Sequence, residues 1–341
     1  MSTEDFFSLT PDRVLSAVEA LGVRCTGLCY PLNSLENRVY EIEREDRSRV
    51  VAKFYRPGRW SVDAVRDEHT FLADLAAAEI PVAAPIALPD GATARYVEGT
   101  SILCALFPRV GGRVPDECTE EQLRRLGGLL ARIHTVGASR AAPHRVSLTV
   151  ARYGRESLAT LLAAPTLPPT LAPRLKAVSE ALFARIGPWF EDLDVHRIHG
   201  DCHPGNLLWG TAGPFFLDFD DMLTGPPVQD LWMLVPAYDE EGAHRRDVVL
   251  EGYEVFRAFD RSTLRLVEPL RAALPPLRRV GHATLARPRV PAGLSALRRG
   301  AVLVGAHRRH RRAARARRGR RRRFADARAE TRGDGRARAL V

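Results

Sequence analysis

The chain has 341 residues, of which 45% are hydrophobic and 27% are charged. This composition is typical of a globular protein and excludes a wholly disordered chain, and the length allows two domains with sizeable cores. The sequence opens without a basic leader, and no uncharged stretch of about 18 residues follows. We therefore expect a cytoplasmic protein without a membrane span.

The net charge of +10 conceals a strong asymmetry along the chain. Residues 271–341 contain 22 arginines and three acidic residues, whereas residues 1–270 contain 29 basic and 38 acidic residues. The main body is therefore acidic, and the basic character belongs to the last segment alone.

The first predicted elements are a short helix over residues 11–21 and a polar turn from Pro31 that leads into a strand containing Val39. The turn lacks a glycine-rich nucleotide signature, and turn formation alone is enough to explain its polar residues. In a nucleotide site, however, Ser34 and its backbone N–H would be placed to bind a phosphate, because exposed amides of such loops bind anions. We keep Ser34 as a candidate nucleotide-binding residue.

Residues 49–55 predict a strand in which Lys53 stands among apolar neighbours. Ser61 is a predicted N-cap for a helix that ends near Glu79, and its apolar face contains Val65, Leu72 and Leu75. Glu68 falls on that same face, where an unpaired charge would be costly. We therefore predict an ion pair with Lys53, as kinases use to hold a lysine against nucleotide phosphates. The alternative is a glutamate in water at the rim of the helix.

A boundary between two lobes is predicted after residues 101–108, which have the pattern of a buried strand ended by proline. The segment that follows has the glycine-containing composition of a hinge. We divide the chain into an N-lobe at 1–108, a hinge linker at 109–114, a helical C-lobe at 115–272 and an atypical tail at 273–341. A cleft between two lobes is a common place for a nucleotide.

The second lobe begins with Thr119 and Gln122 in the pattern of a capping box, followed by leucines at helical spacing. This is a predicted core helix, and His134 near its end is expected to be structural. Residues 149–163 and 170–187 predict two more helices, in which we recognise no chemistry.

The chemistry concentrates around residues 195–218. Residues 195–198 predict a short strand, and residues 207–217 predict a hairpin that ends at Asp218. Asp201 would accept the proton of an attacking hydroxyl and align its oxygen, and Asn206 and Asp218 would bind Mg²⁺ through hard oxygen atoms. A single aspartate carries little information, but this spacing after a Lys–Glu pair is specific for phosphoryl transfer.

A zinc site is the rival interpretation, because His199, Cys202 and His203 stand within five residues. They lack the paired spacing of closed tetrahedral sites. We expect His199 to support the loop through a hydrogen bond and Cys202 to pack in the core. The five cysteines of the chain are expected to be free thiols.

Beyond this region a helix start is predicted near residue 228, and its Asp230 would either favour the helix N-terminus or tether the catalytic loop. A helix from about His244 to Phe259 and a segment at 264–270 complete the predicted lobe.

Together these segments resemble the aminoglycoside-phosphotransferase-like branch of the protein-kinase-like fold, over about residues 5–272. The resemblance rests on residues 31–40, 53–57, 81–85, 199–203, 206, 218–221 and 228–233. It implies a two-lobed α+β fold, with an antiparallel sheet and one helix in a small N-lobe and a mostly helical C-lobe.

The resemblance also implies ATP and Mg²⁺ as cofactors. By the family pattern Asp201 is the proton acceptor, Asn206 and Asp218 bind Mg²⁺, Asp218 is also catalytic, and Ser34 lies at the ATP site. Some bacterial members are serine/threonine kinases of stress responses, which adds a protein substrate that the motifs alone do not supply. We expect a monomer.

Two other functions stay open. A small-molecule phosphotransferase acting on an amino alcohol, a sugar or an aminoglycoside-like compound would share the same catalytic residues. A nucleic-acid-binding protein would act through the arginine-rich tail, and its binding would disappear on deletion of residues 273–341 but not in Asp201→Asn.

The tail itself departs from the family pattern after about residue 272. Residues 271–341 contain no Lys, Asn, Gln, Ile, Met, Trp, Tyr or Cys. Our hypothesis is an out-of-frame translation caused by a frameshift near residue 273, which resequencing of the gene would test. If the tail is genuine, its arginine runs would bind polyanions without specificity.

Overall fold

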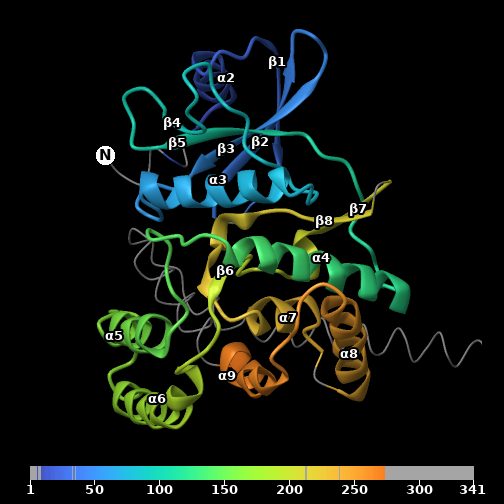
Figure 1. The fold of residues 1–341 in the computed structure, drawn as a ribbon. Helices are drawn as coiled ribbons and strands as arrows, with labels where there is room; N and C mark the ends of the chain where they lie inside the picture. The colour runs from blue at the N-terminus through green and yellow to red at the C-terminus, as the bar shows by residue number, and fades with distance from the viewer. Residues whose placement is uncertain are drawn as a thin grey trace, which may run out of the picture. The chain divides into compact units, whose positions relative to one another are not determined.

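The computed structural model describes Phe6 and residues 9–32, 34, 36–211, 213–237 and 239–272. The predictions made for residues 273–341 lie outside these ranges. The fold is α+β with two lobes, as the sequence predicted (Figure 1).

Five antiparallel strands in the order β1-β2-β3-β5-β4 form the sheet of the N-lobe. They are β1 (Cys25–Leu32), β2 (Arg38–Arg44), β3 (Arg49–Tyr55), β4 (Arg95–Tyr96) and β5 (Leu103–Pro108). The strands predicted in the regions of β2, β3 and β5 are confirmed. Strand β1 was not predicted, and Pro31 belongs to it rather than to a turn. Most of its residues are exposed on both faces, so its sequence lacks the alternation that marks a half-buried strand.

The two faces of this sheet are covered differently. Helix α2 (Pro11–Ala20) packs on the face that carries Ile42 and Phe54. On the other face, Val39, Lys53 and Ala105 are neighbours across β2, β3 and β5. Helix α3 (Val62–Ala77) lies next to the sheet in Figure 1 and begins at the predicted cap, where the Ser61 side chain accepts a hydrogen bond from the amide of Ala64.

The C-lobe is built on helix α4 (Glu120–Ala138), and the predicted capping box between Thr119 and Gln122 is present at its start. It packs closely against α8 (Glu240–Glu254). A Cβ atom on Gly127 would lie 1.9 Å from the carbonyl oxygen of Val249, so only glycine permits this approach. The sequence prediction began α8 at about His244, which is about four residues too late. The helix begins after Asp239, whose side chain caps the amide of Gly242.

Further helical segments complete this lobe. They include a π-helical turn at Val150–Arg155, α5 (Glu156–Leu162), α6 (Ala172–Ile186), α7 (Val228–Leu234), a 3-10 segment at Arg261–Leu266 and α9 (Val267–Ala272). The two helical regions predicted between residues 149 and 187 are confirmed. The predicted helix start near residue 228 is also confirmed.

Two small hairpin-like sheets position the polar loops. Strand β6 (His196–Ile198) pairs with β9 (Leu223–Gly225), and β7 (Leu207–Gly210) pairs with β8 (Gly213–Phe216). The predicted strand and hairpin are therefore present. A bridge between Arg113 and Trp209 joins the segment predicted as a hinge to the β7–β8 hairpin. The exact lobe boundaries stay a prediction.

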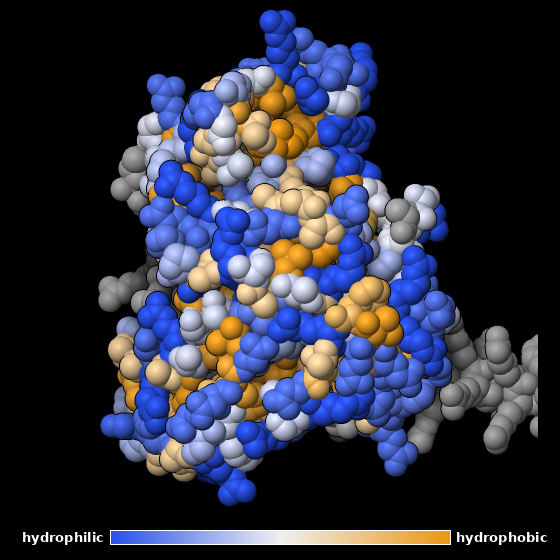
Figure 2. All heavy atoms as spheres, viewed as in Figure 1, coloured by the Kyte–Doolittle hydropathy of each residue, from blue (hydrophilic) through white to orange (hydrophobic). Residues whose placement is uncertain are grey.

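One apolar core continues from the lower face of the sheet into the C-lobe, through Phe107, Phe71, Leu130 and Val249. On the side shown in Figure 2, hydrophilic side chains predominate and apolar ones lie in small groups among them. None of the helices in the described part of the chain has the length and apolar character that crossing a membrane requires.

Candidate active site

Lys53 is the centre of a buried cluster of charges. Its Nζ lies 3.2 Å from Oε1 of Glu68, 3.1 Å from Oδ1 of Asp220 and 3.3 Å from Oδ1 of Asp218. Burial by itself lowers the pKa of Lys53, but the carboxylates of Asp220 and Glu68 outweigh it and hold that pKa well above its ordinary value. The predicted Lys–Glu pair is present, and the lysine is a fixed cation.

Glu68 on α3 belongs to a buried hydrogen-bonded chain that also includes residues of β3 and of a loop. The hydroxyl of Tyr55 donates to Oε1 of Glu68 across 3.3 Å and accepts from Nε2 of His69 at 2.9 Å. The other ring nitrogen of His69 accepts from Thr93 at 2.7 Å. Burial and the charge of Lys53 lower the pKa of His69 to about 3, so this histidine is neutral. These hydrogen bonds hold the carboxylate of Glu68 in place, and that carboxylate in turn holds the ammonium group of Lys53.

Asp218 lies two residues after β8 with φ 59°, in the left-handed region that few residues other than glycine adopt. Its side chain is half exposed, whereas that of Asp220, two residues later, is buried. Burial by itself raises the pKa of Asp220, but Lys53 and Arg59 outweigh it and hold that pKa well below its usual range. The segment therefore presents one open carboxylate beside one buried and ionised carboxylate.

The loop after β6 depends on Gly200, whose φ is 81°. A Cβ atom there would lie 2.3 Å from the carbonyl oxygen of Asp221, so a side chain would push apart the two polar segments. The pairing of β6 with β9 brings these segments together. Glycine is therefore required where the loop passes the Asp218–Asp221 segment.

Asp230 on α7 holds the start of this loop from below. Its carboxylate accepts from the backbone N–H of His199 at 2.9 Å and of Gly200 at 2.8 Å. His199 in turn donates from Nε2 to the carbonyl oxygen of Leu217 at 2.9 Å. Of the two roles considered for Asp230, the structure shows the tether. The predicted hydrogen-bonding role of His199 is also confirmed.

Asn206 lies in the 3-10 turn that follows Asp201. Its Nδ2 donates to the backbone oxygen of Asp201 at 2.9 Å and lies 3.5 Å from the carboxylate oxygen Oδ2. The backbone oxygen of Asn206 accepts a hydrogen bond of 2.8 Å from the amide of Leu217. Leu217 is the residue before Asp218. The structure thus places Asn206 against Asp201 and against the residue before Asp218, and the metal-binding role of Asn206 stays a prediction.

The donor set fits a magnesium ion. The amide nitrogen of Asn206 faces Asp201, which leaves its Oδ1 as a donor, and the carboxylate of Asp218 is half exposed. Oxygen donors of this kind suit a hard cation. The residues considered for zinc do not suit that metal. Nε2 of His199 is already hydrogen-bonded, and burial raises the pKa of the Cys202 thiol well above its usual value, which disfavours the thiolate that zinc binds. Within the described ranges, no three His, Cys, Asp or Glu side chains come together as a metal site.

Ser34 lies in the loop between β1 and β2, half-buried. Its Oγ accepts a hydrogen bond from the amide of Asn37 at 3.3 Å. Among the described residues, this hydrogen bond stays within the loop between β1 and β2, and it does not connect Ser34 to the cluster around Lys53. The nucleotide-binding role of Ser34 stays a prediction.

Two arginines at the site were not predicted. Arg145 is buried, lies 4.0 Å above the ring of Trp60, and donates to the backbone oxygens of Met222 at 2.9 Å and of Asp220. Arg59 forms ion pairs with the carboxylates that follow Asp218. The repeated acids of the sequence Asp218-Phe-Asp-Asp were the available signal, because a buried acid needs a cation.

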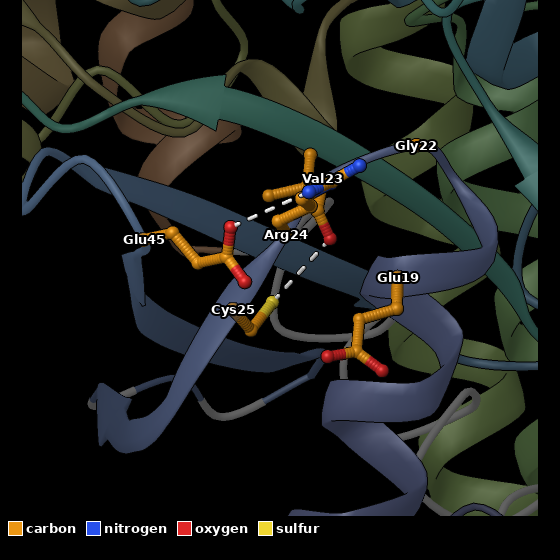
Figure 3. A pocket seen from close by; sticks show the side chains of 6 residues that line it. All are labelled: Glu19, Gly22, Val23, Arg24, Cys25 and Glu45. Carbon is orange, nitrogen blue, oxygen red and sulfur yellow. Dashed lines mark hydrogen bonds and ion pairs between the residues drawn. The ribbon is translucent and has the colours of Figure 1, made fainter.

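A separate hollow of about 300 Å³ lies far along the sheet, between α2 and β1 (Figure 3). Glu19, Cys25 and the ion-paired residues Arg24 and Glu45 line it, and the two ion-pair partners stand 3.9 Å apart with 86% and 60% of their side chains exposed. Ion pairs as exposed as this one contribute little to the free energy of unfolding. This hollow contains none of the residues of the charge cluster.

Comparison with known protein families shows to which family this chain is related. A model of the phosphotransferase enzyme family (APH) matches residues 30–267. The chain belongs to this family. The resemblance inferred from the sequence segments is confirmed.

Among relatives, stress response kinase A of Escherichia coli is 41% identical over 268 residues, which cover 78% of this chain and 80% of the relative. A Salmonella typhimurium protein named serine/threonine protein kinase RdoA is 40% identical over the same length and the same shares. The chain is therefore also similar to the stress-response kinases that the sequence resemblance indicated.

Among solved structures, the amicoumacin kinase hAmiN in complex with AMP-PNP, Ca²⁺ and Ami has a TM-score of 0.69. It is 20% identical, and the match covers 87% of this chain and 93% of that one. A microcompartment-associated aminopropanol kinase has a TM-score of 0.60 at 20% identity, with 81% and 90% covered. Spectinomycin phosphotransferase, in complex with ADP and spectinomycin, has a TM-score of 0.59 at 14% identity, with 83% and 90% covered. These likenesses establish the fold.

Proposed function

We propose that this chain is an ATP- and Mg²⁺-dependent kinase that transfers the γ-phosphoryl group to a serine or threonine hydroxyl of a protein. The observation that carries the proposal is the cluster in which Lys53 meets Glu68 and Asp218 across the two lobes. A fixed cation, an open carboxylate and a tethered Asp-x4-Asn loop are the parts that phosphoryl transfer needs.

Each residue then has one task. Lys53 binds the α- and β-phosphates, and Glu68 orients it. Asp201 accepts the proton of the attacking hydroxyl as the new P–O bond forms and the bond to ADP breaks. Asn206 and Asp218 hold Mg²⁺, which neutralises charge on the phosphates when bound. Ser34 contacts the nucleotide from the loop between β1 and β2.

The names of the relatives at about 40% identity support a protein substrate and a role in bacterial stress response. The solved neighbours support the alternative, since their names are those of kinases for small molecules. An acidic body would suit a cationic small substrate as well as a basic peptide. The higher identity of the first group leads us to prefer the protein kinase.

The test measures transfer from labelled ATP in Mg²⁺ by the full chain. Autophosphorylation and labelling of a generic basic protein by the wild type, both absent in Asp201→Asn, are the expected results. Turnover of an amino alcohol or a sugar without any protein labelling would establish the alternative. A phosphoproteome comparison between cells with the wild-type chain and with Asp201→Asn then identifies the substrate.

A further inference from the structure

One arginine joins two segments that the proposed function places on opposite sides of the nucleotide. Nη1 of Arg59 lies 3.2 Å from Oε2 of Glu36, in the loop between β1 and β2. Nη2 lies 2.8 Å from Oδ1 of Asp221 and 3.2 Å from Oδ2 of Asp220, in the segment that begins at Asp218. The arginine side chain itself is only 15% exposed.

The turn that carries Arg59 is itself well held. The backbone N–H of Arg59 donates to the carbonyl oxygen of Arg56 at 3.2 Å. Arg56 also lies 3.2 Å from the same Oε2 of Glu36, and its amide donates to the side chain of Asn37 at 3.2 Å. Two guanidinium groups from one turn therefore meet the carboxylate of Glu36, which holds Glu36 close to the end of β3.

The charges of the cluster show what Arg59 contributes beyond a mechanical link. Burial by itself lowers the pKa of Arg59, but the carboxylates of Asp220 and Asp221 outweigh it and raise that pKa. Three cations, Lys53, Arg56 and Arg59, form ion pairs with five carboxylates, and the buried Arg145 adds its charge beside Asp220 and Glu68. The five carboxylates are Glu36, Glu68, Asp218, Asp220 and Asp221. Removing one cation would increase the repulsion that ATP phosphates meet beside Lys53.

Asp220 makes this dependence specific. Its buried carboxylate is shared between Lys53 and Arg59, at 3.1 Å and 3.2 Å. Without Arg59, Lys53 and Arg145 would be left to balance the charge of Asp220, and Lys53, which is ion-paired with it, would be held more tightly against the protein. The lysine would then be less available to a phosphate, although it would keep its own charge and its contact with Glu68.

We infer that Arg59 is a positioning residue for phosphoryl transfer, which holds the nucleotide-covering loop in register with the Asp218–Asp221 segment and moderates the grip of Asp220 on Lys53. The inference rests on the proposed function for its kinetic meaning, but the coupling between the two segments belongs to the fold and is measurable without ATP.

The test compares Arg59→Gln, Arg59→Lys, Glu36→Gln and the double variant Arg59→Gln/Glu36→Gln. The control is Arg66→Gln, because Arg66 forms an exposed ion pair with Asp63 on the outer side of α3. We expect Arg59→Gln to raise the KM for ATP about tenfold, with a smaller fall in kcat, because it loses charge-assisted contacts. Arg59→Lys should recover part of this loss. The effects of Arg59→Gln and Glu36→Gln should be less than additive, since each removes the same contact.

Amide hydrogen exchange without nucleotide supplies the second readout. In Arg59→Gln the amides of Glu36–Arg38 and of Asp220–Met222 should exchange faster together, while those of α8 keep their wild-type rates and Arg66→Gln changes neither. A wild-type KM and wild-type exchange in folded Arg59→Gln would overturn the inference and leave the proposed function intact. If the wild-type chain transfers no phosphate from ATP, the proposed function fails, and the exchange rates alone decide whether Arg59 couples the two segments.

Discussion

The imidazole of His134 donates from Nε2 to Oδ2 of Asp230 across 3.0 Å, and both side chains are fully buried. Nδ1 of the same ring lies 3.0 Å from the hydroxyl of Tyr253, so the ring of His134 on α4 joins α7 to α8. The carboxylate of Asp230 also accepts from the amides of His199 and Gly200. Burial by itself raises the pKa of Asp230, but these hydrogen bonds outweigh it and lower that pKa. The position of the loop that begins at His199 is therefore set by the helical core.

We predict that Asp230→Asn lowers both stability and transfer. An asparagine offers one oxygen where the wild type offers two to His134 and the loop amides, so at least one buried N–H loses its partner. The expected loss is about 2–4 kcal/mol in the free energy of unfolding, with at least a tenfold fall in transfer. Urea unfolding and labelled-ATP assays measure the two effects. Asp194→Asn, which removes an exposed acid paired with Arg257, is the matched control and should change neither.

Lys53 is paired in the buried cluster and is proposed to bind the phosphates, and a second prediction separates these two roles. Lys53→Met leaves Glu68 and Asp220 buried with one cation fewer, so the free energy of unfolding should fall by about 3 kcal/mol and transfer should be lost. Adding Glu68→Gln removes one of the stranded charges. The double variant should therefore recover part of the stability and none of the activity.

Thermal and urea unfolding of the single and double variants, together with the transfer assay, measure this difference. Recovery of transfer in Lys53→Met/Glu68→Gln would show that the lysine acts only by neutralising the glutamate. Equal destabilisation of the single and double variants would show that the buried pair has no energetic coupling.

Much of this site was predictable because its signals are local. Lys53 is one of two lysines in the sequence and interrupts an apolar strand, and helical periodicity places Glu68 on the buried face of α3. Asp201 and Asn206 share one short loop. In each case the pattern lies within a few residues, where spacing and burial are linked by the geometry of a single element.

Arg59 and Arg145 show what such reasoning misses. The chain has 51 basic residues, nearly all of them arginine, and nothing nearby marks the few that are buried. Arg59 meets Asp221 across 162 positions, and Arg145 meets the oxygen of Asp220 across 75. Strand β1 was missed for a related reason. It is an edge strand whose stability comes from its pairing with β2 rather than from its own pattern.

The metal-binding role proposed for Asp218 can be separated from the proton-accepting role proposed for Asp201. We predict that Asp218→Asn and Asp201→Asn both reduce transfer by about 10²–10⁴. Asparagine tolerates the left-handed backbone at position 218, so the first variant should fold. The two variants should differ in their response to Mg²⁺. ATP with Mg²⁺ should raise the melting temperature of the wild type and Asp201→Asn more than ATP alone does, and Asp218→Asn should lose that difference.

Thermal melts with ATP in the presence and absence of Mg²⁺ measure the effect, and EDTA should abolish it in every variant. A full Mg²⁺-dependent shift in Asp218→Asn would move the metal site to other residues. Wild-type transfer in Asp201→Asn would remove that residue from the reaction.

The last prediction concerns pH and rests on His69, whose pKa is lowered to about 3 from an ordinary value of 6.5. The unfolded chain takes up a proton below pH 6.5 that the folded chain does not bind until about pH 3. The stability contributed by the neutral ring is therefore complete above pH 6.5 and is lost as the pH falls from there toward 3. For this group alone the loss of unfolding free energy between pH 7 and pH 5 is about 2 kcal/mol.

In His69→Gln, which keeps polar contacts to Tyr55 and Thr93 without titrating, urea unfolding should show a correspondingly smaller loss over the same interval. Identical pH dependence in the two proteins would contradict a neutral buried His69 and place a proton on the ring in the native state.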